Sequence, residues 1–199
     1  MDADIEYKPT SSFVRFLALV ENGPLVTKWE KDSSYLAMPY WDKNKKASAF
    51  GHNWTAGEDF SAGVSKAQGY EILSQDVVKH WAAGQRKVDK KYGEGTWGGM
   101  SSTQQEALTD IEFNVRGGTT GTSRHHGYPK LTDAIVNGNQ AEIVRQFRRP
   151  ETPEREKEWW RLFGRELSGG IKYSQTASVA KSLTRLEEFG VDLRRLSFD

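Results

Sequence analysis

The sequence contains no cysteine among its 199 residues, which excludes disulfide bonds and thiolate metal sites. Its charge is nearly balanced, with 28 Lys and Arg against 27 Asp and Glu, so composition gives no reason to expect a nucleic-acid partner. Long apolar runs are also missing. The run at 13–20 is interrupted by Arg15 and is too short to cross a bilayer.

The start of the chain is polar and acidic, without the basic start and small-residue cleavage site of a secretory signal peptide. We therefore expect neither a signal peptide nor a membrane span. The length suits one domain, alone or with a small second lobe, and allows a sizeable core.

Apolar residues at helical spacing predict a mainly helical chain. Ser11 or Ser12 caps a first helix, which Asn22-Gly23-Pro24 ends, and Pro24 opens a short helix to Lys31. Further helices are predicted at about 65–87, 102–115, 129–138, 139–147, 152–163 and 179–189. A capping sequence precedes several of them, including Ser65-x-x-Gln68, Ser102-x-x-Gln105 and Asn139-x-x-Glu142.

The convincing β signal is confined to residues 38–60, where short aromatic runs alternate with Asn, Gly and Lys clusters. This region predicts a small twisted sheet. The expected fold class is therefore α+β, mainly α, with a small sheet followed by a long helix.

Two acidic residues flank the start of this β region. Glu30 ends the short helix beside Trp29, where packing would favour its protonated form, and Asp42 precedes a lysine-rich turn that would keep it ionised. Two carboxylates with such different surroundings suit glycoside hydrolysis. Acidic residues are common in this chain, so the pair taken alone is more simply interpreted as surface charge.

Several short motifs follow one another in a fixed order along residues 22–166. They are Asn22-Gly23 with Leu25 to Glu30, Tyr40-Trp41-Asp42, Phe50-Gly51-His52, Ser65 to Gln68 with Leu73 to Val77, Gln105 to Leu108 with Phe113-Asn114-Val115, and Thr152 to Arg155 with Glu158 to Phe163. In this order they resemble the phage-type lysozymes of glycoside hydrolase family 24. The resemblance implies a lysozyme-like fold, with a β lobe at about 38–60 and a helical lobe joined by a long helix.

The same resemblance implies three parts of the chain: an N-terminal extension at 1–21, a catalytic domain at 22–166 and a helical C-terminal extension at 167–199. It implies a muramidase that hydrolyses the β-1,4 bond between N-acetylmuramic acid and N-acetylglucosamine. Glu30 would be the general acid, Asp42 the second carboxylate and Ser48 the residue that holds the attacking water.

Residues later in the chain would complete the implied site. Phe113 and Asn114 would line the sugar site, and Arg155 would face the acid. A structural pair between His52 and Asp76 is also implied, which keeps His52 out of the catalytic set.

The motifs depart from the family pattern at three places. Glu30 and Asp42 lie farther apart than usual, Lys31 replaces a glycine, and the stretch to His52 is one residue short. The shortened stretch puts Ala47 or Ser48 opposite the family threonine, and only Ser48 has a hydroxyl.

Glu21 is the rival acid. It also ends an apolar helix and precedes Asn-Gly, but it requires a longer insertion before Asp42. The sequence alone does not decide between Glu21 and Glu30 as the general acid.

No cofactor and no metal are expected, because the adjacent His125 and His126 lie in a polar loop without nearby Asp, Glu or Cys. The expected partner is bacterial peptidoglycan, and the protein is expected to be a monomer. The protein would stay in the host cytoplasm until a phage holin releases it to the cell wall, or it would travel in the virion, with the terminal extensions contacting virion partners.

Two other functions remain as alternatives: a lytic transglycosylase, which needs the glutamate but no second carboxylate, and a peptidoglycan-binding virion or effector component with weak catalysis. A helical interaction module without a glycan ligand fits the composition but explains none of the motifs.

Overall fold

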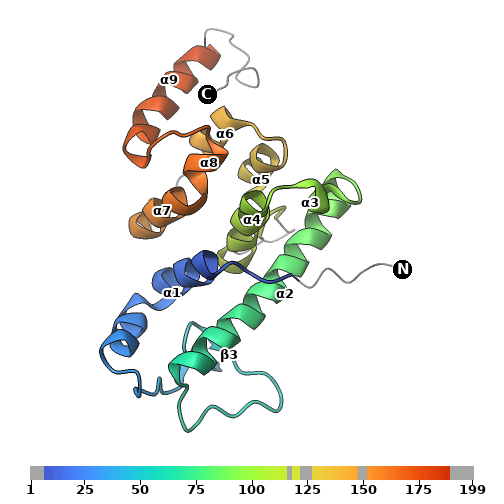
Figure 1. The fold of residues 1–199 in the computed structure, drawn as a ribbon. Coiled ribbons are helices and arrows are strands. Elements are labelled where there is room, and N and C mark those ends of the chain that lie inside the picture. The colour runs from blue at the N-terminus through green and yellow to red at the C-terminus, as the bar shows by residue number, and fades with distance from the viewer. Residues whose placement is uncertain (1–6, 116–117, 122–126, 148–151, 189–199) are drawn as a thin grey trace. The chain divides into compact units, whose positions relative to one another are not determined.

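The computed structural model describes residues 7–115, 118–121, 127–147 and 152–188. They are mainly helical with one small antiparallel sheet, which confirms the α+β, mainly α class. The chain divides into two compact units, Met1–Lys79 and His80–Asp199. Figure 1 shows the elements along the chain.

The first unit holds the sheet. Its elements are α1 (Ser11–Lys31), β1 (Tyr40–Asp42), β2 (Lys45–Ser48), β3 (His52–Asn53) and the first part of α2 (Lys66–Tyr92), which continues into the second unit.

Helix α1 consists of two segments joined at a kink (Figure 1). Thr10 caps the first, one residue before the expected serines, and its hydroxyl accepts a 3.2 Å hydrogen bond from the Phe13 N–H. Asn22 leaves helical geometry (φ −153°, ψ 64°) and caps the second by accepting a 3.2 Å bond from the Leu25 N–H. Pro24 suits the new first turn, so the predicted break is confirmed without a connecting loop.

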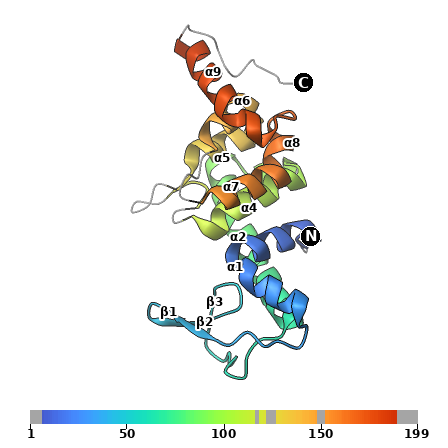
Figure 2. The same cartoon turned by 90° about the vertical axis from the view of Figure 1, so that its left-hand side faces the viewer.

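The sheet has the order β1-β2-β3, with antiparallel neighbours, and Figure 2 shows β1 and β2 as a hairpin. Its cross-strand pairs are Tyr40 with Ala47, Trp41 with Lys46, Asp42 with Lys45, Ala47 with Asn53 and Ser48 with His52. The predicted sheet is therefore confirmed, within residues 40–53. Because side chains alternate along a strand, Tyr40 and Asp42 share one face and Trp41 lies on the other.

Trp29 forms the centre of an aromatic core in the first unit. Its ring meets Phe50 edge to face, with centroids 5.6 Å apart, and lies 6.3 Å from Tyr70 of α2. The indole N–H donates a 2.8 Å hydrogen bond to the Tyr35 carbonyl. This core joins α1, the loop after β2 and α2.

The second unit is helical in its described part. Its elements are the rest of α2, α3 (Thr96–Gly99), α4 (Ser102–Asn114), α5 (Pro129–Val136), α6 (Gln140–Gln146), α7 (Pro153–Trp159), a π-helical turn (Trp160–Gly164), α8 (Arg165–Leu167), a 3-10 turn (Tyr173–Gln175) and α9 (Thr176–Glu188).

Aromatic packing holds the second unit together. The ring of Phe147 stacks on Trp159, with centroids 4.1 Å apart, and Trp160 donates a 2.8 Å hydrogen bond from its indole N–H to the Ile171 carbonyl. Helix α9, in the expected C-terminal extension, packs against α6 and buries Leu183.

Capping sequences mark several helix starts. The reciprocal bonds between Ser65 and Gln68 at the start of α2 confirm the prediction there. Asn139 caps α6 as expected, by accepting from the Glu142 N–H. At α4 the capping box begins at Ser101, one residue before the predicted serine.

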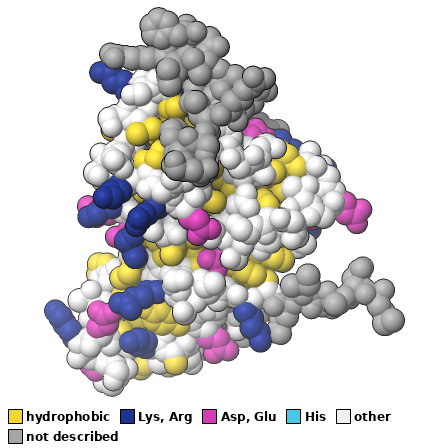
Figure 3. Space-filling model, turned by 45° about the horizontal axis from the view of Figure 1, so that its top comes forward, with side chains coloured by type: hydrophobic (Ala, Val, Ile, Leu, Met, Phe, Trp, Pro, Cys, Tyr) yellow, Lys and Arg dark blue, Asp and Glu magenta, His cyan; other side chains and the backbone are white. Residues whose placement is uncertain are grey.

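Within the described ranges, no helix is long and apolar enough to span a membrane. Figure 3 shows one face of the molecule, on which acidic and basic side chains both lie among hydrophobic ones. That mixture matches the nearly balanced charge of the sequence.

The aromatic core leads to a stability prediction. In Gly69→Ala the new Cβ would lie 2.5 Å from Cη2 of the buried Trp29. We expect the free energy of unfolding, measured by urea denaturation, to fall by about 1–3 kcal/mol. Gly23→Ala is the matched helical control, because its Cβ would meet nothing within 4 Å. Equal stability of the two variants would contradict the packing of Trp29 on α2.

Candidate active site

Glu30 lies on the exposed side of the last turn of α1. Its side chain is 52% exposed, and its Oε1 is 3.9 Å from Nη2 of Arg15, in the first segment of the same helix. The neighbouring Trp29 points into the core, and consecutive helical residues face directions about 100° apart. The burial expected for Glu30 is therefore absent, and its described ionic partner is Arg15.

The negative charges of Glu21 and Asp42, by contrast, both affect the pKa of the Tyr40 hydroxyl. Glu21 is the residue before the kink of α1 and is partly buried, whereas Asp42 ends β1. Partial burial raises the pKa of the Tyr40 phenol, and the negative charges of Asp42 and then Glu21 raise it further. Glu21 and Asp42 are thus both close enough to Tyr40 for their charges to affect its hydroxyl.

A small cavity of about 150 Å³ adjoins Tyr40 in the first unit. It is lined by Asn22, Pro24, Leu25 and Lys28 of α1 and by Tyr35, Ala37, Met38, Tyr40 and Ala49. The Lys28 ammonium lies 5.1 Å from the centroid of the Tyr35 ring and 3.5 Å from its hydroxyl. Aromatic rings and an ammonium thus line a hollow together with Asn22, the residue after Glu21, whereas Glu21 and Asp42 themselves are not part of its lining.

Asn22 connects this hollow to the sheet. Its Nδ2 donates a 3.0 Å hydrogen bond to the carbonyl of Ala49, which adopts a left-handed backbone (φ 50°). That conformation costs a residue with a Cβ about 1–2 kcal/mol. The same amide that caps the second segment of α1 therefore also holds a strained residue after β2.

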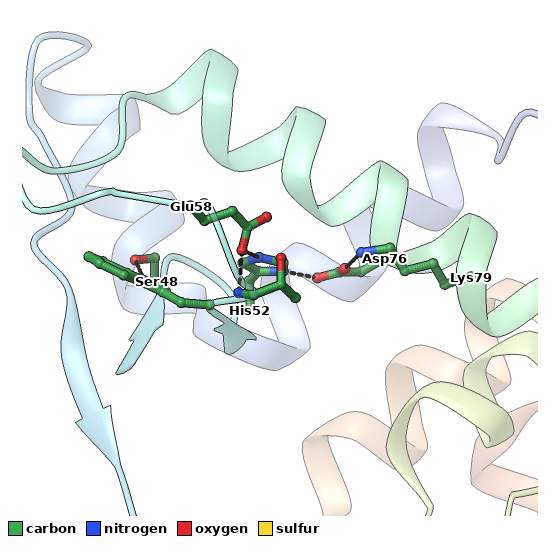
Figure 4. A network of polar contacts seen from close by, with 7 residues as sticks. Ser48, His52, Glu58, Asp76 and Lys79 are labelled. Atoms are coloured by element: carbon green, nitrogen blue, oxygen red, sulfur yellow. Dashed lines mark hydrogen bonds and ion pairs between the residues drawn. The ribbon is translucent and has the colours of Figure 1, made fainter. Parts of the chain in front are cut away.

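Ser48 is enclosed rather than open to solvent. Its side chain is fully buried, and its Oγ accepts a 2.7 Å hydrogen bond from the Trp54 indole N–H (Figure 4). The neighbouring candidate, Ala47, is also buried. No exposed hydroxyl remains at either position to hold the attacking water, so the expected role of Ser48 gives way to a structural one.

His52 lies between two carboxylates, as Figure 4 shows. Its Nδ1 is 2.7 Å from Asp76 Oδ2, which confirms the expected pair, and its Nε2 is 3.0 Å from Glu58 Oε2. Asp76 in turn binds Lys79 at 2.9 Å. Glu58 was not predicted, because it lies in a polar loop without periodicity.

The surroundings of His52 determine its charge. Burial acts to lower the His52 pKa, but hydrogen bonds to Glu58 and Asp76, with their negative charges, outweigh it and leave the pKa raised. A backbone bond from Thr55 and the bond from His52 lower the pKa of Glu58 to about 2. Below the raised pKa, an imidazolium therefore joins β3 to the following loop and to α2.

The remaining predicted residues lie in the second unit, where two of them meet at one carboxylate. Asp110 is fully buried, and its Oδ1 accepts from Arg155 at 2.5 Å and from the Asn114 amide at 2.8 Å. The Phe113 ring packs on His80, with centroids 4.7 Å apart. Asp110 was not predicted, because an aspartate in mid-helix resembles a solvent-facing residue.

The His125-His126 pair lies outside the described residues. Within the described part, no group of three or more His, Asp or Glu side chains is arranged to hold a metal ion.

No family model, curated protein or solved structure matches the chain. The resemblance to family 24 therefore rests on the ordered short motifs alone.

The double role of Asn22 is testable. Asn22→Asp keeps the capping oxygen but replaces the donor to the Ala49 carbonyl with a second oxygen. We expect it to lose about 1–2 kcal/mol of unfolding free energy in urea denaturation, although aspartate is a good cap. Thr10→Asp is the control at the other cap of α1 and should lose little. A fully stable Asn22→Asp would show that the bond to Ala49 is unimportant.

The His52 network predicts a pH-dependent stability. Because the folded-state pKa of His52 is raised, its contribution is complete below the ordinary value of 6.5 and is lost as the pH rises through the raised pKa. At the acid end, Glu58 loses its contribution as the pH falls from 4.5 towards about 2. We expect His52→Asn to lose about 2 kcal/mol of unfolding free energy between about pH 4.5 and 6.5, and less outside this range. The rate of the peptidoglycan hydrolysis implied by the resemblance should change little.

Urea denaturation of wild type and His52→Asn across this pH range measures the effect. Lys79→Ala is the control, because its side chain is 63% exposed and its loss should stay below about 1 kcal/mol. If the loss of unfolding free energy in His52→Asn grew as the pH rose above the raised pKa, the charged pair would be contradicted.

Proposed function

We propose that the chain is a muramidase that hydrolyses the β-1,4 bond between N-acetylmuramic acid and N-acetylglucosamine, with Glu21 as the general acid and Asp42 as the second carboxylate. One observation carries this choice: Tyr40, which shares a face of β1 with Asp42, and Asn22, which directly follows Glu21, line the same cavity within the first unit. The ordered family-24 motifs support the muramidase activity, although they contain Glu30 rather than Glu21 as the acid.

In this proposal, Glu21 donates a proton to the glycosidic oxygen as the bond to the sugar's anomeric carbon breaks. Asp42 stabilises the positive charge that develops on the sugar ring, and water supplies the hydroxyl for the new end. Asp42 suits this role because it is exposed and pairs in register with Lys45. Tyr40, on the same face of β1 as Asp42, contributes a hydroxyl to the proposed site.

Within the second unit, the resemblance implies sugar-binding residues. We propose that Phe113 and Asn114 contact sugar there. Since the Arg155 guanidinium binds Asp110, which also accepts from Asn114, we assign Arg155 the task of orienting Asn114. The proposed partner is bacterial peptidoglycan, reached through a phage holin or from the virion.

Lysis of outer-membrane-permeabilised Gram-negative cells tests the assignment. We expect Glu21→Gln to lower the rate of turbidity loss by about 10²–10⁴-fold, since the general acid is removed, and Asp42→Asn to lower it strongly. Glu30→Gln is the matched control and should retain activity, because Glu30 pairs with Arg15 on the exposed side of α1. Thermal melts confirm that each variant is folded.

Other outcomes identify the competing functions. If only Glu30→Gln is inactive, the acid is Glu30 and the shared action on Tyr40 has no catalytic meaning. Cleavage by Asp42→Asn that leaves anhydro-sugar ends indicates a lytic transglycosylase. A wild type that binds cell wall without lysing it indicates a binding component.

A further inference from the structure

The face of the sheet that carries Trp41 presents a row of three side chains. Trp41 pairs in register with Lys46 of β2, and the Trp54 N–H donates a 3.0 Å hydrogen bond to the Lys46 carbonyl, which extends the pairing beyond β3. Cross-strand neighbours project from the same face. Trp41, Lys46 and Trp54 therefore stand side by side on the face opposite Tyr40 and Asp42.

Hydrogen bonding to Ser48 holds the inner end of this row in place. The buried Ser48 hydroxyl accepts from the Trp54 indole at 2.7 Å and so fixes that ring. The Lys46 ammonium lies 4.9 Å from the centroid of the Trp54 ring, in a cation–π contact that holds the charge in place. Trp41, at the outer end, is 68% exposed, more than any other large hydrophobic residue described.

This arrangement has the chemistry of a binding surface for an anionic glycan. A flat, exposed indole stacks against the C–H face of a pyranose ring, and a held ammonium beside it pairs with a carboxylate. Lys43 adds positive charge at the turn of the same hairpin, whereas Asp42 and its cross-strand partner Lys45 lie on the opposite face. Hydrogen bonds from Ser61 and, less strongly, the Lys46 ammonium hold the pKa of Asp59 low, so one carboxylate of the following loop already lies near Lys46. The additional charge of Lys43 still favours a carboxylate-bearing ligand over a neutral one.

We propose that Trp41, Lys46 and Trp54 form a second, non-catalytic surface that binds a carboxylate-bearing amino-sugar polymer of the peptidoglycan type. The proposal goes beyond the hydrolysis proposed above and does not require it. A lipid surface fits less well, because interfacial binding needs a broad apolar face and this one offers a single exposed ring. Single-stranded nucleic acid fits less well because the formal net charge of the chain is only +1.

Co-sedimentation with purified peptidoglycan sacculi tests the surface, using the full chain with Glu21→Gln to limit digestion. We expect Trp41→Ala to bind roughly five- to tenfold more weakly, the scale of losing one aromatic stacking platform. Lys46→Gln should weaken binding to native sacculi but not to sacculi whose carboxylates have been amidated. Leu36→Ala and Lys31→Ala, two exposed positions elsewhere in the first unit, are the matched controls and should bind normally.

Unchanged binding by Trp41→Ala, or an equal loss in Leu36→Ala, would overturn the proposal. Tighter Trp41-dependent binding to anionic lipid vesicles or single-stranded DNA than to sacculi would overturn the assignment of the ligand. The experiments distinguish a failure of the binding-surface proposal from a failure of the muramidase proposal. Lysis by a chain whose Trp41→Ala variant binds normally overturns this one alone, whereas Trp41-dependent binding without hydrolysis supports it and overturns the muramidase.

Discussion

The two hydrogen bonds of the Asn22 amide determine where the candidate site lies. Its oxygen starts the second segment of α1, and its nitrogen holds the carbonyl of Ala49 in a left-handed turn. Glu21 immediately precedes the kink, and Asp42 belongs to the hairpin that leads to Ala49. One amide therefore sets the helix that carries one carboxylate against the sheet that carries the other. An ionised carboxylate at this position would accept the first bond but has no N–H to donate the second.

The sheet is fixed at β3 and exposed at the turn between β1 and β2. At the anchored end, His52 is buried and lies between Glu58 and Asp76, so β3 is joined to α2 by charge-assisted bonds. At the other end, the two-residue turn between Asp42 and Lys45 places Lys43 at φ 56° and leaves the hairpin exposed. Rigidity at β3 fixes the position of β1, although three residues of β1 bury little by themselves.

Features written in local sequence were predictable, and features that depend on distant partners were not. Asn22-Gly23-Pro24 predicted the kink because each residue limits its own backbone, and the capping sequences located helix starts within about a residue. A single buried tryptophan in a short helix does not determine which way its neighbour points, so the exposure of Glu30 was missed. The Asp110 bond to Arg155 joins residues far apart in the chain, and no local pattern records it.

Side-chain alternation on β1 keeps the two proposed activities apart. Tyr40 and Asp42 face one way and Trp41 the other, so a glycan held by Trp41 does not occupy the carboxylates. This separation depends on register, because a slip of one residue would exchange the faces, and the two-residue turn opposes such a slip. An enzyme acting on an insoluble polymer gains from such a surface. A chain that stays bound after one cleavage meets the next bond at a high effective concentration.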